Sequence, residues 1–531
     1  MSGVAGVELI FLLLLAFVTA FALLASKLDT PYPIVLVLGG LVLGIVPGMP
    51  RITLDPQVIF LVVLPPLLYS AAWQTSWRDF RYNIVSIGLL AFGLVGFLVA
   101  AVTWLAPHML TGFNAGAGFI LGAVVAPTDA IAATSIARRV GLPRRIVDVL
   151  EGESLINDAS GLLALEFGIA YLVRGQMPTV TEGMLRLLWL TVGGIVVGLI
   201  VGYVVAWVER KIDDGPIEIT LGFLVPYTAY LLAEKVHASG VMAVVACGLL
   251  LSRQSAGFFS PKVRLQAWSV WEAFTFALNG LVFVLIGLQL PLVLEGLRDY
   301  SLGTLVVSGL LFSVLLILLR LAWTFPGAHL ANYFRRCVLH QNEPKPSMRQ
   351  IFVVGWTGMR GVIALAAALA LPLQGANGEA FSQRPMIVFL TFSAILVTLI
   401  LQGLSLPPMI RALGLAGASG PNCEEYDARR LMLEAAIQHI EGSRSHDQQE
   451  FAGVYDDLAQ HYRDELAELR GGNGDGDNAN GSQNERHRNL AREVLGVERQ
   501  TLIALRDEGR ISDEVLRDLE RKLDLGETRL H

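Results

Sequence analysis

Long apolar runs separated by short polar connections fill the first 411 residues of the chain. Each run has close to the ~20 residues that a helix needs to cross ~30 Å of hydrocarbon. The pattern predicts an all-α polytopic membrane protein with about thirteen spans, at residues 6–26, 31–48, 54–73, 83–107, 115–137, 147–172, 185–207, 217–235, 239–252, 268–290, 302–328, 349–372 and 385–411.

Composition supports this fold class. Hydrophobic residues make up 53% of the 531 residues, charged residues make up only 16%, and the mean hydropathy is +0.55. Long apolar stretches with so little charge are typical of helical membrane proteins. We therefore expect membrane lipid around residues 1–411, and nothing in the composition indicates a nucleic-acid partner.

The charge balance changes after the last predicted span. Residues 412–531 contain 15 Lys and Arg against 25 Asp and Glu, a net charge of −10. We predict two domains, a transmembrane domain over residues 1–411 and an acidic, mainly helical domain over residues 412–531. Within the second, GGNGDGDNANGSQ at residues 471–483 predicts a flexible linker between helical stretches.

The basic residues in the connections predict the orientation. With an external N-terminus, the cytoplasmic connections and span ends carry 17 Lys and Arg and the external ones carry six. Because positive charge concentrates on the cytoplasmic side, we expect an external N-terminus and a cytoplasmic tail. Thirteen spans also allow two inverted repeats of six helices around a linker span, an arrangement typical of secondary transporters.

The sixth predicted span contains EGESLINDASG at residues 151–161. Asp158 lies about 11 residues into the span, ~16 Å from its start and close to the membrane centre. Ser154 and Asn157 share a helix face with it. Hard oxygen ligands suit a small cation such as Na⁺ or Li⁺, and suit K⁺ less well. The alternative for Asp158 is a carboxylate that pairs with a basic residue and only holds helices together.

The fifth predicted span contains APTDA at residues 126–130. Pro127 removes a backbone donor and disfavours helix at the residue before it. Freed carbonyl groups in a broken helix can coordinate a cation. We therefore expect Thr128 and Asp129 to face the same ligand as Asp158, with a simple kink as the alternative.

The twelfth predicted span contains Arg360 near its middle. An unpaired Arg at this depth costs at least ~2.5–3.5 kcal/mol on the insertion scale. Glu153 lies beside the ligand face of the sixth span, and we predict a structural ion pair between Glu153 and Arg360. Spans five and twelve would then be two broken helices that cross. Arg320 in the eleventh span is expected to snorkel or to pair.

Motifs of enzymes are missing from the sequence. No HExxH, P-loop or G-x-S-x-G motif occurs in the context that its chemistry requires. We therefore expect a transporter rather than an enzyme, with no cofactor.

Five motifs resemble those of the monovalent cation:proton antiporter-1 family, the bacterial sodium/proton antiporters of NhaP and NHE type. They are LPPLL at 64–68, APTDA at 126–130, EGESLINDASG at 151–161, LNGLVFVLIGLQLP at 278–291 and GMRGVIALAAALALP at 358–372. The resemblance extends over nearly all of residues 6–411, and the motifs occur in the family's order.

The resemblance implies a homodimer in the plasma (inner) membrane of a bacterium, with a role in pH homeostasis. It implies that a transported Na⁺ and a proton compete for Asp158. Ser154 and Thr128 would help to coordinate the Na⁺, and Asp129 and Asn157 would support the site. An Asn-Asp pair is associated in the family with electroneutral one-for-one exchange. Many relatives carry an acidic residue where this chain has Ser70. The resemblance therefore does not imply that this chain prefers Na⁺ over K⁺.

We therefore hypothesise a secondary antiporter that exchanges Na⁺, with Li⁺ as a further substrate, for H⁺ by alternating access. One alternative is a K⁺/H⁺ antiporter that uses the same residues. More distant alternatives are a cation channel and a membrane sensor that signals through its tail. The tail contains no kinase, cyclase or nucleotide-binding motif, which disfavours the sensor.

Overall fold

The structure is a computed structural model. It describes residues 3–46, 54–174, 179–258, 261–337, 340, 346–374, 380–416, 423–444, 452–471, 498 and 501. Its contacts divide the chain into two compact units, Met1–Ser419 and Gly420–His531. The described residues are helical and form no strand, apart from an isolated β-bridge between Gln374 and Ala380.

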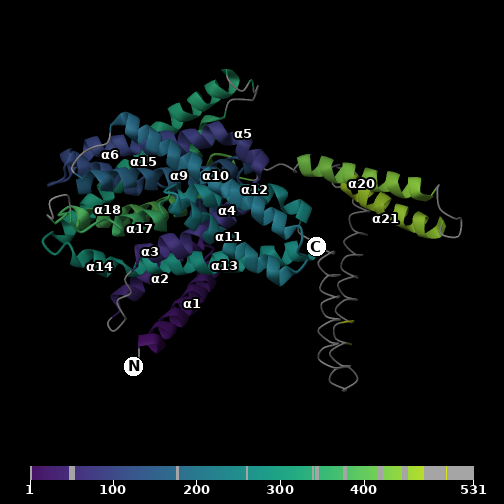
Figure 1. Ribbon diagram of the computed structural model, residues 1–531, viewed down its shortest axis with the longest axis horizontal. Helices are drawn as coiled ribbons and strands as arrows, with labels where there is room; N and C mark the ends of the chain where they lie inside the picture. The colour runs from purple at the N-terminus through teal and green to yellow at the C-terminus, as the bar shows by residue number, and fades with distance from the viewer. Residues whose placement is uncertain are drawn as a thin grey trace. The chain divides into compact units, whose positions relative to one another are not determined.

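The first unit is a bundle of long helices (Figure 1). Its helices, including the three π-helical turns η1–η3, are α1 (Gly3–Lys27), α2 (Tyr32–Ile45), α3 (Pro56–Val58), η1 (Ile59–Val63), α4 (Leu64–Gln74), α5 (Trp77–Gly88), η2 (Leu89–Leu94), α6 (Val95–Met109), α7 (Ala115–Val125), α8 (Ala130–Val140), α9 (Arg144–Arg174), α10 (Val180–Glu209), α11 (Gly215–Lys235), α12 (Gly240–Phe258), α13 (Pro261–Leu288), α14 (Leu290–Glu295), α15 (Leu302–Cys337), α16 (Met348–Trp356), α17 (Val362–Leu369), α18 (Arg384–Val397), η3 (Thr398–Gln402) and α19 (Gly403–Ala412).

Ten helical segments among the described residues are long and apolar enough to cross a membrane. Two shorter apolar helices, Tyr32–Ile45 and Gly240–Gln254, accompany them. The all-helical, multi-span fold is therefore confirmed. The count of thirteen spans, the inverted repeats and the orientation stay predictions.

Two of the expected spans are interrupted. The fifth consists of α7 and α8, and residues 126–129 between them are not helical. Pro127 lacks the backbone N–H that would continue α7, and Asp129 starts α8 by accepting a hydrogen bond from the Ile131 N–H at 2.8 Å. The twelfth consists of α16 and α17 with non-helical residues 357–361 between them. Both predicted breaks are present.

The helices α2 and α13 approach each other at backbone distance. A Cβ atom on Gly40 would lie 2.2 Å from the Val284 carbonyl oxygen, and one on Gly287 would lie 2.3 Å from the Val37 carbonyl oxygen. Small residues of this kind allow close helix packing in membranes, where van der Waals contact rather than water exclusion drives association. The two helices therefore form a tightly packed pair.

The second unit contains α20 (Cys423–Arg444) and α21 (Ala452–Gly471), which pack against each other. Arg463 and Glu441 join them through an ion pair of 2.5 Å. These helices lie within the stretch predicted to be helical before the linker. Apart from Gly471, the predicted linker 471–483 lies outside the described residues.

Candidate functional site

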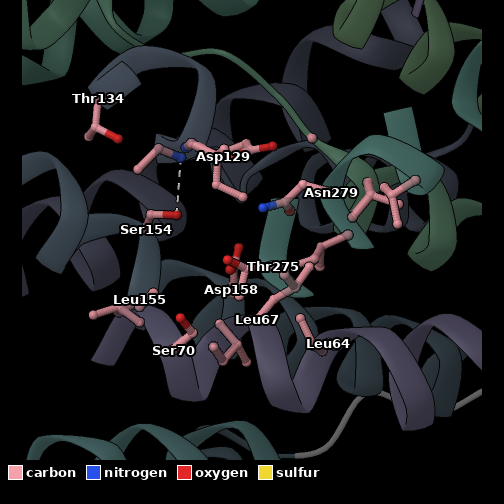
Figure 2. Close-up of a pocket in the computed structure, with 18 of the residues that line it drawn as sticks. Leu64, Leu67, Ser70, Asp129, Thr134, Ser154, Leu155, Asp158, Thr275 and Asn279 are labelled. Carbon is pink, nitrogen blue, oxygen red and sulfur yellow. Dashed lines mark hydrogen bonds between the residues drawn. The ribbon is translucent and has the colours of Figure 1, made fainter. Parts of the chain in front are cut away.

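A cavity of about 440 Å³ lies where the two interrupted spans meet α2, α4, α9 and α13. Figure 2 shows side chains from several of these helices converging on it. Four of the five predicted ligand residues line it, namely Thr128, Asp129, Ser154 and Asp158. Residues that were predicted from the sequence and lie up to 30 positions apart therefore line one shared cavity.

Asp158 is the carboxylate on the α9 wall. Its side chain is buried, with 5% of its surface exposed, and it lines the cavity. It receives no hydrogen bond and forms no ion pair with any other residue that the structure describes, in contrast to the pairing role considered as its alternative. A buried charge without a protein partner is costly, so this group requires a proton or a cation from outside the protein.

The neighbours of Asp158 are held by hydrogen bonds to the break in the fifth span. The Ser154 hydroxyl donates to the Thr128 carbonyl oxygen at 2.9 Å and accepts from the Ala130 N–H at 3.2 Å. The Asn157 amide donates to the Thr128 hydroxyl at 2.6 Å. Asn157 does not line the cavity, so it positions Thr128 rather than facing a ligand.

The two breaks contact each other directly. The Asp129 N–H donates to the Met359 carbonyl oxygen at 2.8 Å. A Cβ atom on Gly361 would lie 2.3 Å from Asp129 Oδ2, so only glycine fits there. The unwound segments of spans five and twelve therefore cross, and Asp129 stands at the crossing.

The predicted ion pair between Glu153 and Arg360 is wrong. Glu153 is paired with Arg320 of α15, whose two terminal nitrogens lie 2.5 and 2.8 Å from its carboxylate oxygens. Glu153 is 1% exposed and Arg320 is fully buried. The Thr128 hydroxyl also donates to Glu153, at 3.0 Å. The pair thus connects α15 and α9 to the broken span.

Arg360 is held by backbone carbonyl groups instead. Its Nε donates to the Val125 carbonyl oxygen at 3.1 Å, and its Nη1 donates to the Gly358 carbonyl oxygen. Val125 is the last residue of α7, where unpaired carbonyls and the helix dipole favour a cation. Arg320 likewise donates to the Val354 carbonyl near the end of α16, at 3.2 Å. Each of the two arginines therefore stabilises the C-terminal end of one interrupted helix.

An ion pair lies at one end of the cavity. Arg138 Nη2 and Glu151 Oε1 are 2.6 Å apart, and both residues line the cavity. The Arg138 side chain is 62% exposed, so the cavity reaches solvent here. In the predicted topology this end faces the cytoplasm.

Sequence reasoning missed the wall opposite Asp158. Thr275 and Asn279 of α13 and Tyr32 of α2 line the cavity. The motif LNGLVFVLIGLQLP includes Asn279, but no pattern in it indicates which residue faces a ligand. Arg320 was missed as the partner of Glu153 because the sequence does not show that its side chain reaches from α15 to α9.

We expect Gly361→Ala to disrupt the crossing. The new methyl group would overlap Asp129, and overpacking of this kind costs about 1–3 kcal/mol. The melting temperature of the detergent-purified protein should fall, and transport should fall with it. Gly88→Ala is the matched control, because no atom lies within 4 Å of the added Cβ. A Gly361→Ala protein as stable and active as Gly88→Ala would contradict the close contact.

The chain matches known exchangers in sequence. The family "Sodium/hydrogen exchanger, transmembrane" matches residues 12–412. The chain is 34% identical over 527 residues to the uncharacterized Na(+)/H(+) exchanger Rv2287 of Mycobacterium tuberculosis, covering 97% of this chain and 95% of that one. It is 32% identical to the sodium, potassium, lithium and rubidium/H(+) antiporter of Bacillus pumilus, covering 79% of this chain and 64% of that one.

The fold matches a solved antiporter structure. The sodium proton antiporter MjNhaP1 from Methanocaldococcus jannaschii superposes with a TM-score of 0.61 at 21% identity, covering 79% of this chain and all of that one. This likeness shows a shared fold. The sequence match over most of the membrane unit establishes that the chain belongs to the transmembrane sodium/hydrogen exchanger family.

Proposed function

We propose that the chain is a secondary antiporter that exchanges Na⁺, and also Li⁺, for H⁺ across the bacterial plasma membrane. The observation that carries this proposal is Asp158, a buried carboxylate that lines a cavity open to solvent and that receives no hydrogen bond from the described residues. Membership of the exchanger family supports the same substrate class.

In the proposed mechanism, Asp158 binds either a proton or a cation. Moving a bare carboxylate through a dry barrier is costly, so the protein changes state only when the charge is neutralised. Ser154 and the carbonyl of Thr128 offer further oxygen ligands beside it, and Asp129 and Asn157 hold the broken span in place. Competition for one carboxylate couples the two fluxes without a separate gate.

We argue the stoichiometry from the carboxylates of α9 and the fifth span; Glu272 of α13 also lines the cavity but is exposed. Glu153 keeps its charge through Arg320, and Asn157 is neutral. Asp129 accepts a backbone hydrogen bond from the start of α8. With Asp158 as the exchangeable group, we propose one cation for one proton, which is electroneutral.

Potassium is a second candidate substrate. The antiporter of Bacillus pumilus is named for sodium, potassium, lithium and rubidium. Ser70 places no charge on the α4 wall of the cavity, and its hydroxyl already accepts a hydrogen bond from Gln74 at 3.0 Å. Less negative charge weakens the advantage of the smaller cation, so K⁺/H⁺ exchange at the same site remains the alternative.

A transport assay separates these candidates. Proteoliposomes with an imposed pH gradient should lose that gradient when Na⁺ or Li⁺ is added, and the apparent KM should rise at lower pH because protons then occupy Asp158. A stronger response to K⁺ than to Na⁺ would favour the alternative. A cation current without any change in the pH gradient would indicate a channel and contradict the proposal.

Assembly and orientation belong to the same proposal. We propose an external N-terminus and a cytoplasmic C-terminal unit, on the basis of the basic residues in the connections. We also propose a homodimer, which the resemblance to the antiporter family implies. The role of the acidic C-terminal unit is regulatory or simply structural. Deletion of residues 420–531 distinguishes a regulatory role from a structural one. Transport with an unchanged pH profile would show that the unit does not regulate exchange.

A further inference from the structure

The wall opposite Asp158 contains a buried amide. Asn279 of α13 is 9% exposed and lines the cavity. Figure 2 shows its amide projecting into the cavity between Asp129 and Asp158. Across the described ranges, its side chain has no hydrogen-bond partner, so its polar atoms have only the cavity to face.

The amide of Asn279 has no protein partner among the described residues, so only water or a ligand in the cavity can satisfy it. An apolar residue of similar size would need no such partner. The neighbouring cavity residues of α13, Val282 and Phe283, are apolar. The Thr275 hydroxyl donates to the Trp271 carbonyl oxygen at 2.8 Å. Glu272 of α13 and Tyr32 of α2 also line this side of the cavity, but they are less buried. Asn279 is thus the buried polar side chain of this wall that has no hydrogen-bond partner among the described residues.

The oxygen atoms on the other wall cannot surround a cation. Asp158, Ser154 and the Thr128 carbonyl approach from α9 and the fifth span. Hard cations take several oxygen ligands from more than one direction, and those that the protein does not provide come from water. The α4 wall offers Ser70 and Gln74, which are hydrogen-bonded to each other. An oxygen from α13 would complete the ligand set from the opposite side.

We propose that Asn279 is a selectivity-determining residue that places its amide oxygen on the transported cation or on a water that the cation keeps. This inference rests on the proposed cation/proton exchange. An amide is a neutral ligand, so it stabilises the bound cation without adding a second group that exchanges protons. Small cations gain more from a close oxygen dipole than large ones, so Asn279 favours Na⁺ and Li⁺ over K⁺.

The experiment compares Asn279→Ala with wild type in proteoliposomes. The apparent KM for Na⁺ and Li⁺ should rise about five- to tenfold, because the cation loses one oxygen ligand. The maximal rate should change little. The KM for K⁺ should change less, so the ratio of the Na⁺ and K⁺ constants should fall. Asn279→Asp retains an oxygen and should keep the KM for Na⁺ at or below the wild-type value.

Val282→Ala is the matched control. It lies one turn further along α13, lines the same cavity and removes a similar volume without a polar atom. Equal shifts in Asn279→Ala and Val282→Ala, or an unchanged ratio of the Na⁺ and K⁺ constants, would overturn the assignment. Size-exclusion profiles identify variants that fail to fold. Wild-type protein that exchanges no cation for protons would instead contradict the proposed function, so the two failures are distinguishable.

Discussion

Asp158→Asn should abolish exchange and leave the protein folded. Asparagine keeps the shape of the side chain but cannot carry the charge that binds either a cation or a proton. No described residue pairs with Asp158, so removing its charge leaves no buried counter-charge unpaired. Proteoliposomes with this variant should show the same decay of the pH gradient as empty liposomes at every Na⁺ concentration.

The control for this variant lies on the same helix. Glu151→Gln removes a carboxylate at the mouth of the cavity, where the side chain of its partner Arg138 is 62% exposed. Exposed ion pairs contribute about 0–1 kcal/mol, so this variant should keep proton-coupled exchange. Full proton-coupled transport by Asp158→Asn would show that exchange does not need the Asp158 carboxylate.

Glu153→Gln and Arg320→Gln should both destabilise the protein strongly. Each leaves one charge buried without its counter-charge, and breaking a buried pair in this way costs about 3–5 kcal/mol. Thermal unfolding in detergent measures the loss. The double variant should be less destabilised than the sum of the single variants, because neither charge then remains unpaired.

The double-mutant cycle also tests the choice of partner. A second cycle with Glu153→Gln and Arg360→Gln should show weaker coupling, since Arg360 donates to the Val125 and Gly358 carbonyls rather than to Glu153. Stronger coupling to Arg360 than to Arg320 would contradict the arrangement described above. Melting temperatures equal to wild type in all single variants would argue against a buried pair altogether.

Local sequence signals predicted the all-helical, multi-span fold and one side of the cavity. Apolar runs of helical length reveal the spans, and Pro127 reveals the break before α8. Asp158 and Ser154 are one helical turn apart, so their shared face could be read from spacing alone. These inferences depend only on residues that are close in the chain.

Long-range neighbours could not be obtained in this way. Glu153 was assigned to Arg360, and the sequence does not show that the side chain of Arg320 on α15 reaches it. Arg360 was assigned by depth alone, whereas the structure uses it at the end of α7. Asn279 belongs to an apolar helix with no periodic signal, so only the folded cavity reveals it.

The backbone contact between α2 and α13 restricts how this protein can move. Gly40 and Gly287 bring the two backbones so close that an added Cβ atom on either would overlap a carbonyl group of the opposite helix. We therefore expect α2 and α13 to move together as one body. If the chain works by alternating access as proposed, we expect the moving boundary to pass through the cavity, between α13 and α9. Each transport cycle would then bring the Asn279 and Asp158 faces together and draw them apart.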